Sequence, residues 1–286
     1  MPYLSDIEYS RDACVDAVRG YFRFLTQMYL DPADVVEPPA GGWPSITRDT
    51  LAGVGKTDEV LALLRRLPYL RASSDGRRIQ GAAYAAFANW AHDAEAIRAG
   101  RYDADDLKTT TESASLCDVV PPHVVGLTEG PRETPVFLLD TARGIVLWHE
   151  CPGEIKHGSS SDGDGDGGGT GTSTSTSTPI EGVLDDPYDY ESDEEQATWR
   201  GDSAAWAVPD FFAMLADLFR RLLFVPLSKH TVHDAYIRGL DPDLLPAVRA
   251  VYRKHHWPDL VRYDKAACMA ELRATLRTRF PQYAED

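Results

Sequence analysis

The run Gly53-Val-Gly-Lys-Thr57 combines residue types that could bind a phosphate. Phosphate-binding loops use glycines, whose backbone N–H groups approach the phosphate closely, and a lysine that neutralises its charge. The full motif also needs a buried strand leading in and a glycine five residues before Gly55, where this chain has Thr50. Residues 46–52 are polar and helix-like. We therefore expect no nucleotide site, and we expect Lys56 at the surface just before a helix capped by Thr57.

The run Asp-Gly-Asp-Gly-Asp-Gly at 162–167 matches the first half of a calcium-binding loop. The twelfth position of such a loop must be a bidentate glutamate, and here it is Ser173. Because no helix-forming sequence flanks the run, we interpret it as low-complexity sequence and not as a metal site.

The eight histidines show no spacing typical of a metal or catalytic centre. His230 and His233 are three residues apart, His255 and His256 are adjacent, and His123 opens a predicted strand, where a structural role is common. H-E-x-x-H and Cys/His ligand pairs do not occur, and no serine lies in G-x-S-x-G. The sequence therefore predicts no catalytic residue, no cofactor and no metal, although distant side chains can still converge in a fold.

Two residues are candidates for regulation or recognition. Trp43 lies in Gly-Gly-Trp-Pro, a context that forms a tight turn and presents an aromatic ring. It either closes the core between two helices or anchors a partner protein. Ser192 precedes Asp193-Glu-Glu195, which suits an acid-directed kinase, so it is a candidate phosphorylation site.

Composition excludes several classes of protein. With 286 residues, 43% of them hydrophobic, the chain can bury a large core. Its net charge of −16 argues against general nucleic-acid binding, which needs a basic surface. The most apolar segment, 211–227, contains Asp217, Arg220 and Arg221, so we expect no membrane span. The first residues do not resemble a secretory signal and the four cysteines are scattered, which indicates reduced thiols and a cytoplasmic or nuclear location.

Apolar spacing predicts the helices that position these residues. Ser5 and Glu8 form a capping box that opens a first helix ending before Asp31. The other predicted helices begin after Thr57 or cover 209–223, about 241–254 and about 264–280. Residues 79–98 fit a helix or extended chain, and we leave both open.

Residues 123–148 predict a three-stranded antiparallel meander. Val136–Leu139 and Ile145–Trp148 flank a loop opened by Asp140 and closed by Gly144, as a short hairpin requires. A third run, His123–Leu127, is connected through a turn at Thr128-Glu-Gly-Pro131. The apolar stripe of the 209–223 helix should cover one sheet face, which leaves the opposite face, or a groove beside Trp43, for a partner.

Gly/Ser/Thr repeats and an acidic run predict a disordered insert at about 159–195. We therefore predict a single α+β domain over 1–227, interrupted by this insert. Residues 228–286 are predicted to form a C-terminal helical appendage that packs on this domain.

Motifs over nearly the whole chain resemble a family of uncharacterised filamentous-fungal proteins, a resemblance that implies no activity. They are GGWPSI, GKTDEV, LLRRLPYL, PPHVV, FLLDTARGIV, DFFAMLADLFRRL, HHWPDL and Tyr263-Asp-Lys-Ala-Ala-Cys268. Over about 119–225, the strands, the D-x-x-x-G hairpin, the Trp-bearing return and the aromatic-rich helix are similar to the SUKH superfamily. That is the fold of fungal cell-wall-assembly regulators and of bacterial immunity proteins that neutralise toxins. It implies an α+β protein-binding module without catalytic residues, although the long helical N-terminal half departs from it.

The sequence thus predicts a non-catalytic protein-interaction module whose partner is another protein. The alternative is a hydrolase or transferase with a site that no motif reveals. A deep pocket lined by convergent His, Asp or Arg would favour the enzyme, and an open sheet surface or an aromatic-rimmed groove would favour the module.

Overall fold

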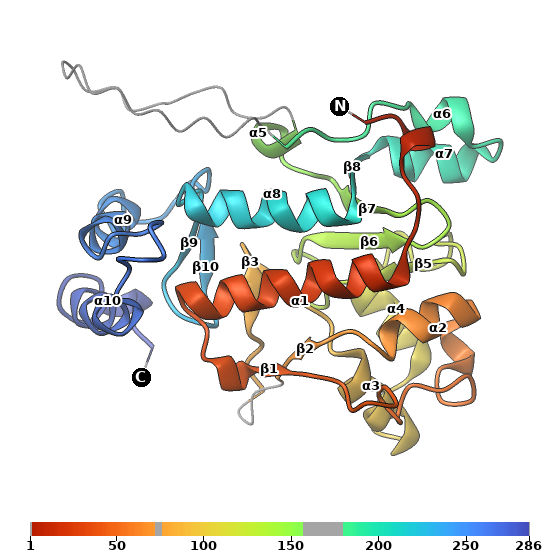
Figure 1. The fold of residues 1–286 in the computed structure, drawn as a ribbon, viewed down its shortest axis with the longest axis horizontal. Helices are drawn as coiled ribbons and strands as arrows, with labels where there is room; N and C mark the ends of the chain where they lie inside the picture. Colours follow the sequence, from red (N-terminus) through yellow and green to blue (C-terminus); the bar gives the residue numbers. More distant parts are fainter. Residues whose placement is uncertain (1, 72–75, 157–179, 286) are drawn as a thin grey trace.

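A computed structural model describes residues 2–71, 76–156 and 180–285. The chain is a mixed α/β protein with small antiparallel sheets (Figure 1). The helices are α1 Arg11–Met28, α2 Asp58–Leu64, α3 Trp90–Arg98, α4 Ala104–Glu112, α5 Gly153–Lys156, α6 Pro187–Tyr190, α7 Glu194–Gly201, α8 Val208–Arg220, α9 Leu244–Lys254 and α10 Lys265–Arg279. The strands are β1 Val35–Val36, β2 Tyr69–Leu70, β3 Gln80–Ala82, β4 Ala85–Ala86, β5 Val124–Gly126, β6 Val136–Asp140, β7 Ile145–His149, β8 Ser203–Ala207, β9 Phe224–Pro226 and β10 Val232–Asp234.

The central sheet has four antiparallel strands in the order β5-β6-β7-β8. Its first three strands are the predicted meander, which is confirmed, and β8 extends it. At the β6–β7 turn the Gly144 N–H donates to the Asp140 carbonyl at 2.9 Å. Gly144 has φ +72°, the left-handed conformation that the spacing required.

Both faces of this sheet are buried. Alternate residues such as Phe137 face α8, where its ring centroid lies 5.0 Å from that of Phe211, and α8 lies beside α1 (Figure 1). The intervening residues, including Leu138 and Leu147, face a second apolar cluster that contains Trp199. The prediction that α8 covers one face is therefore confirmed. The expectation that the opposite face is open is wrong, because α7 and the N-terminal segment cover it.

The N-terminal segment departs from the predicted first helix. Its helix α1 begins at Arg11 and is capped by Ser10, whose hydroxyl accepts the Ala13 N–H at 3.3 Å. The capping box predicted at Ser5 is wrong. There the chain forms one 3-10 turn at Leu4–Asp6 and then extends, because Leu4 and Ile7 pack on the second face of the sheet.

The ambiguous stretch 79–98 contains both alternatives. Strands β3 and β4 form a hairpin, and α3 follows directly after it, with Asn89 as its cap. The helices predicted at 241–254 and 264–280 are confirmed as α9 and α10, and Thr57 caps α2 as expected, accepting the Val60 N–H at 3.3 Å.

The structure places part of the predicted insert, and the predicted domain boundary falls at a hairpin. Residues 159–179 lie outside the described residues, but residues 180–195 are placed and include α6 and the start of α7. The boundary between 227 and 228 falls inside the β9–β10 hairpin. In addition, α9 and α10 share the core with α8, and the Trp257 indole N–H donates to the Phe219 carbonyl at 3.0 Å.

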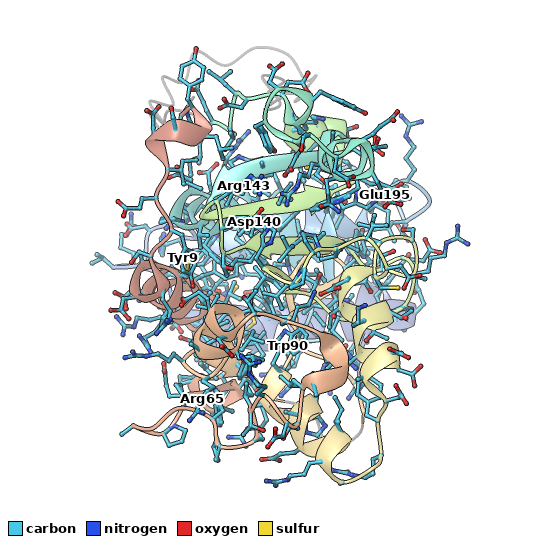
Figure 2. All side chains as sticks on the ribbon, turned by 90° about the vertical axis from the view of Figure 1, so that its right-hand side faces the viewer. Tyr9, Arg65, Trp90, Asp140, Arg143 and Glu195 are labelled. Atoms are coloured by element: carbon cyan, nitrogen blue, oxygen red, sulfur yellow. The ribbon has the colours of Figure 1, made fainter. Side chains whose placement is uncertain are left out.

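A buried ionic network holds the acidic segment against the sheet. The Arg200 guanidinium lies 2.9 Å from the Asp140 carboxylate and 2.9 Å from that of Glu191. Arg143 lies 3.2 Å from Asp140 (Figure 2). It also lies 2.7 Å from Glu191. Acidic residues were expected to keep this segment disordered, but two arginines neutralise part of its charge. In the described ranges, no helix combines the length and apolar character that crossing a bilayer requires.

Candidate functional site

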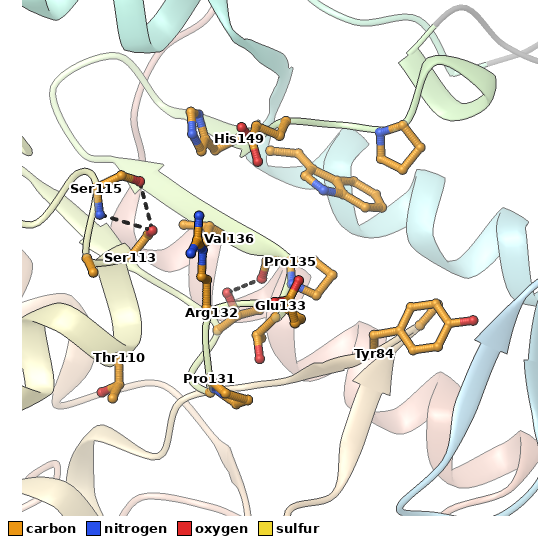
Figure 3. Close-up of a pocket in the computed structure, with 18 of the residues that line it drawn as sticks. Tyr84, Thr110, Ser113, Ser115, Pro131, Arg132, Glu133, Pro135, Val136 and His149 are labelled. Atoms are coloured by element: carbon orange, nitrogen blue, oxygen red, sulfur yellow. Dashed lines mark hydrogen bonds between the residues drawn. The ribbon is translucent and has the colours of Figure 1, made fainter. Parts of the chain in front are cut away.

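A groove of about 770 Å³ opens where the β5–β6 loop, the end of β7 and the segment after α4 meet (Figure 3). Helix α4 ends at Glu112, and Ser113, which follows it, has a φ of 69°. The lining of the groove is rich in hydroxyl, proline and aromatic side chains: Thr109, Thr110, Ser113, Ser115, Thr134, Pro131, Pro135, Pro152, Tyr84 and Trp148.

The β5–β6 loop forms one wall of this groove and is held in place by Thr128. The Thr128 hydroxyl donates to the Pro135 carbonyl at 2.7 Å and accepts the Phe137 N–H at 3.1 Å. A side chain at Gly130 would meet the Thr134 hydroxyl at 2.1 Å. The predicted turn residues therefore form a tight loop with a defined shape.

Three residues that line the groove have a left-handed backbone. Tyr84, Ser113 and Glu150 have φ values of 57°, 69° and 53°. This conformation costs of order 1–3 kcal/mol for a residue with a side chain, and such residues concentrate at functional sites. The strain at three points around one groove is our reason for treating it as the candidate site.

The groove is acidic, and one of its hydroxyl groups contacts a base: the Tyr84 hydroxyl lies 3.1 Å from the His233 Nδ1 atom. Glu133 and Glu150 are exposed and form no ion pair among the described residues, whereas Arg132 is the one arginine in the lining. The His149 Nδ1 atom is buried without a hydrogen-bond partner in the described structure. The hydroxyl of Ser113 is hydrogen-bonded to the hydroxyl of Ser115, with 3.0 Å between the two oxygens. Among the described lining residues, no serine or threonine hydroxyl is hydrogen-bonded to a basic side chain, as activation for covalent catalysis requires.

Trp43 lies away from this groove, and its contacts are those of a residue that covers the edge of the core. The half-buried indole donates its N–H to the Leu67 carbonyl at 2.8 Å and lies beside Tyr69, with ring centroids 5.7 Å apart. Ser192 is exposed just before Asp193, whose carboxylate caps α7 by accepting the N–H groups of Glu195 and Gln196. The structure therefore brings neither residue to the groove.

Lys56 is not a surface residue, and that prediction is wrong. Its side chain is 2% exposed and its Nζ lies 2.6 Å from the carboxylate of Glu112, which is 0% exposed. Burial lowers the pKa of Lys56 and raises that of Glu112. The lysine of the Gly-Lys-Thr run is therefore paired inside the protein. The possible calcium loop at 162–167 lies outside the described residues.

His230 and His233 lie at the β9–β10 hairpin, whereas His255 lies at the end of α9. The His230 Nδ1 lies 2.9 Å from the Arg78 carbonyl, and the His255 Nε2 lies 2.9 Å from the Glu271 carboxylate. Within the ranges that the structure describes, no three His, Cys, Asp or Glu side chains are arranged to hold a metal ion.

A second cavity, of about 390 Å³, contains a pair of buried carboxylates that the sequence did not reveal. Asp93 comes from α3, Glu129 follows β5, and Arg78 precedes β3 and pairs with Glu129. Burial and the charge of Glu129 raise the pKa of Asp93 to about 8, although the positive charge of Arg78 acts to lower it. No sequence motif could show this convergence, because the three residues come from three separate segments.

The Asp93 carboxyl group is expected to make stability depend on pH. Since its pKa is about 8 in the folded chain and about 4 when unfolded, its contribution is complete below about pH 4 and is lost as the pH rises through about 8. Asp93→Asn should remove this decline and be more stable than the parent at about pH 9, by about 1–3 kcal/mol. Denaturant unfolding across this range measures the effect, with the exposed Asp106→Asn as control. A decline in Asp93→Asn parallel to that of the parent would contradict the assignment.

Comparisons of the chain with protein-family models, with curated proteins and with solved structures found no match.

Proposed function

We propose that this chain is a non-catalytic protein-interaction module, and that the groove beside the central sheet binds an extended, basic segment of a partner protein. The observation that carries this proposal is the groove itself, which combines strained walls with unpaired carboxylates and has no serine or threonine bonded to a basic side chain among its described lining residues. A cytoplasmic or nuclear location belongs to the same proposal and is compatible with the four free cysteines.

A SUKH-like fold is part of this proposal. The resemblance over about 119–225 implies strands, a hairpin and an aromatic-rich helix in that order. The four-stranded antiparallel sheet with α8 across one face supports it, because it contains those elements in the same order. A fold of this kind binds proteins through its surface and needs no catalytic group.

The coverage of the sheet restricts how a partner could bind. Strand addition needs an open edge, but residue 183 lies along β8, with the Val183 N–H donating to the Ala205 carbonyl at 2.7 Å. At the other edge, the Ala88 N–H donates to the Leu127 carbonyl at 2.9 Å. The groove remains, and its hydroxyl groups can bond the backbone of an extended segment.

Charge indicates the chemistry of that segment. The groove presents the carboxylates of Glu133 and Glu150 on a chain of net charge −16. Lysine or arginine in the partner would pair with these groups and be attracted by the whole chain. A basic segment therefore fits this groove better than an acidic one.

Selection of short random displayed peptides against the full chain tests the proposal. We expect recovered peptides enriched in lysine and arginine, with binding that weakens as salt is added. The double variant Glu133→Lys/Glu150→Lys should weaken binding at least about tenfold, or about 1.4 kcal/mol. The control Glu194→Lys/Glu195→Lys alters two exposed acids on α7 and should bind as the parent does. Peptides without basic residues, or equal binding by the groove variant, would overturn the proposal.

A further inference from the structure

The cavity at Asp93 and Glu129 has more hydrogen-bond acceptors than donors. Asp93 is 5% exposed, and its Oδ2 has no hydrogen-bond partner among the described residues. Glu129 is fully enclosed and meets one cation, the guanidinium of Arg78. A buried carboxylate oxygen without a donor is costly, so when both acids are ionised, two carboxylates served by one guanidinium require further N–H groups.

The mouth of the cavity has the opposite charge. Arg71, Arg77 and Arg101 line it together with His92, and the exposed guanidinium of Arg101 forms no ion pair in the described part of the chain. A simple cation would be repelled at this rim, whereas an anionic group would be attracted to it. The cavity therefore suits a small molecule that has an ammonium group at one end and an anion at the other.

The remaining walls of the cavity determine which kind of molecule fits there. Leu70, Ile79 and Phe87 give the cavity an apolar side. A volume of about 390 Å³ is near the lower end of the range for small-ligand sites. No serine, threonine or cysteine is among its described lining residues, so the arrangement suits binding and not nucleophilic catalysis.

We propose that this cavity binds a free α-amino acid, with its ammonium group between Asp93 and Glu129, its carboxylate facing Arg101 and its side chain against the apolar wall. The proposal is independent of the peptide groove. The two cavities lie on either side of residues 128–130, where Thr128 and Gly130 line the groove and Glu129 lines the amino-acid cavity.

Binding of an ammonium group should release a proton. The charged and titratable groups around Asp93 are Glu129, Arg78, Tyr69 and Tyr102, with His92, Arg71, Arg77 and Arg101 at the mouth. Since the pKa of Asp93 is raised to about 8, its carboxyl is protonated at neutral pH in the empty cavity. A cation beside it favours the ionised form, so binding should strengthen as the pH rises from about 6 to about 8.

Titration calorimetry of the full chain with the proteinogenic L-amino acids tests this inference. At least one amino acid should bind with a Kd of about 1 mM or lower, and proton release should appear as a dependence of the heat on the buffer. Methylamine and acetate, which each supply one of the two charges, should bind at least about tenfold more weakly.

Three variants distinguish this site from adventitious binding. Glu129→Gln and Arg101→Ala should each weaken binding at least about tenfold. Arg98→Ala, an exposed change on helix α3, which also contains Asp93, should leave binding unchanged. Because Arg101 is exposed, Arg101→Ala keeps the test valid if Glu129→Gln does not fold. Absence of binding by every amino acid, equal binding of methylamine, or undiminished binding by Arg101→Ala would overturn the proposal.

Discussion

Replacing Lys56 with methionine is expected to lower the free energy of unfolding by about 3–5 kcal/mol. The change leaves the carboxylate of Glu112, which is 0% exposed, without the ammonium group that lies 2.6 Å away. An uncompensated buried charge is among the most destabilising defects in a protein, and total stability is only about 5–15 kcal/mol. Denaturant unfolding, followed by circular dichroism, measures the loss.

Two further variants make this result specific to the buried pair. Lys56→Met combined with Glu112→Leu removes both charges, so it should recover most of the lost stability. Arg48→Met breaks an ion pair with Asp58 in which both side chains are 73% exposed, and it should cost less than about 1 kcal/mol. If Lys56→Met is as mild as Arg48→Met, the pair is not buried as described.

Truncation of Phe212 should be equally severe, at about 3–5 kcal/mol for Phe212→Ala. This ring of α8 is buried, and its centroid lies 5.4 Å from that of Tyr21 on α1 and 6.2 Å from that of Phe87. Removing it opens a cavity where α8, α1 and the segment before α3 meet, and a close-packed core refills such a cavity only in part. Chemical denaturation gives the change directly.

A matched substitution on the surface provides the comparison. Leu184→Ala removes a large apolar side chain that is 45% exposed, so it should change stability by less than about 1 kcal/mol. A small effect of Phe212→Ala, similar to that of Leu184→Ala, would mean that α8 does not pack across α1 and the sheet as observed.

The elements that local chemistry dictates were predictable. The β6–β7 hairpin follows from Asp140 and Gly144 at fixed positions between two apolar runs, because only a few turn geometries accept that spacing. Helix α8 was predictable because its apolar stripe is too wide to be left exposed to solvent. In both cases the residues that determine the element lie close together in the sequence.

Elements that depend on a distant partner were not predictable. Ser5 and Glu8 carry a sound capping pattern, yet α1 begins at Arg11 because Leu4 and Ile7 are buried on the far face of the sheet. The acidic residues 185–195 read as disordered, yet Arg143 and Arg200 neutralise part of their charge. In both cases the free energy gained by tertiary burial or charge pairing outweighs the local conformational preference.

By itself, the sequence determined the meander, most helices and the absence of recognisable catalytic motifs, since each of these is written in residues close together in the chain. Only the tertiary structure determined which polar and charged side chains come together in a cavity. Asp93 and Glu129 are far apart in sequence, as are Ser113 and Glu150, and neither pair has a spacing that marks it. The physical reason is that a cavity and the pKa of a buried acid depend on what encloses them, and that enclosure exists only after the helices have packed on the sheet.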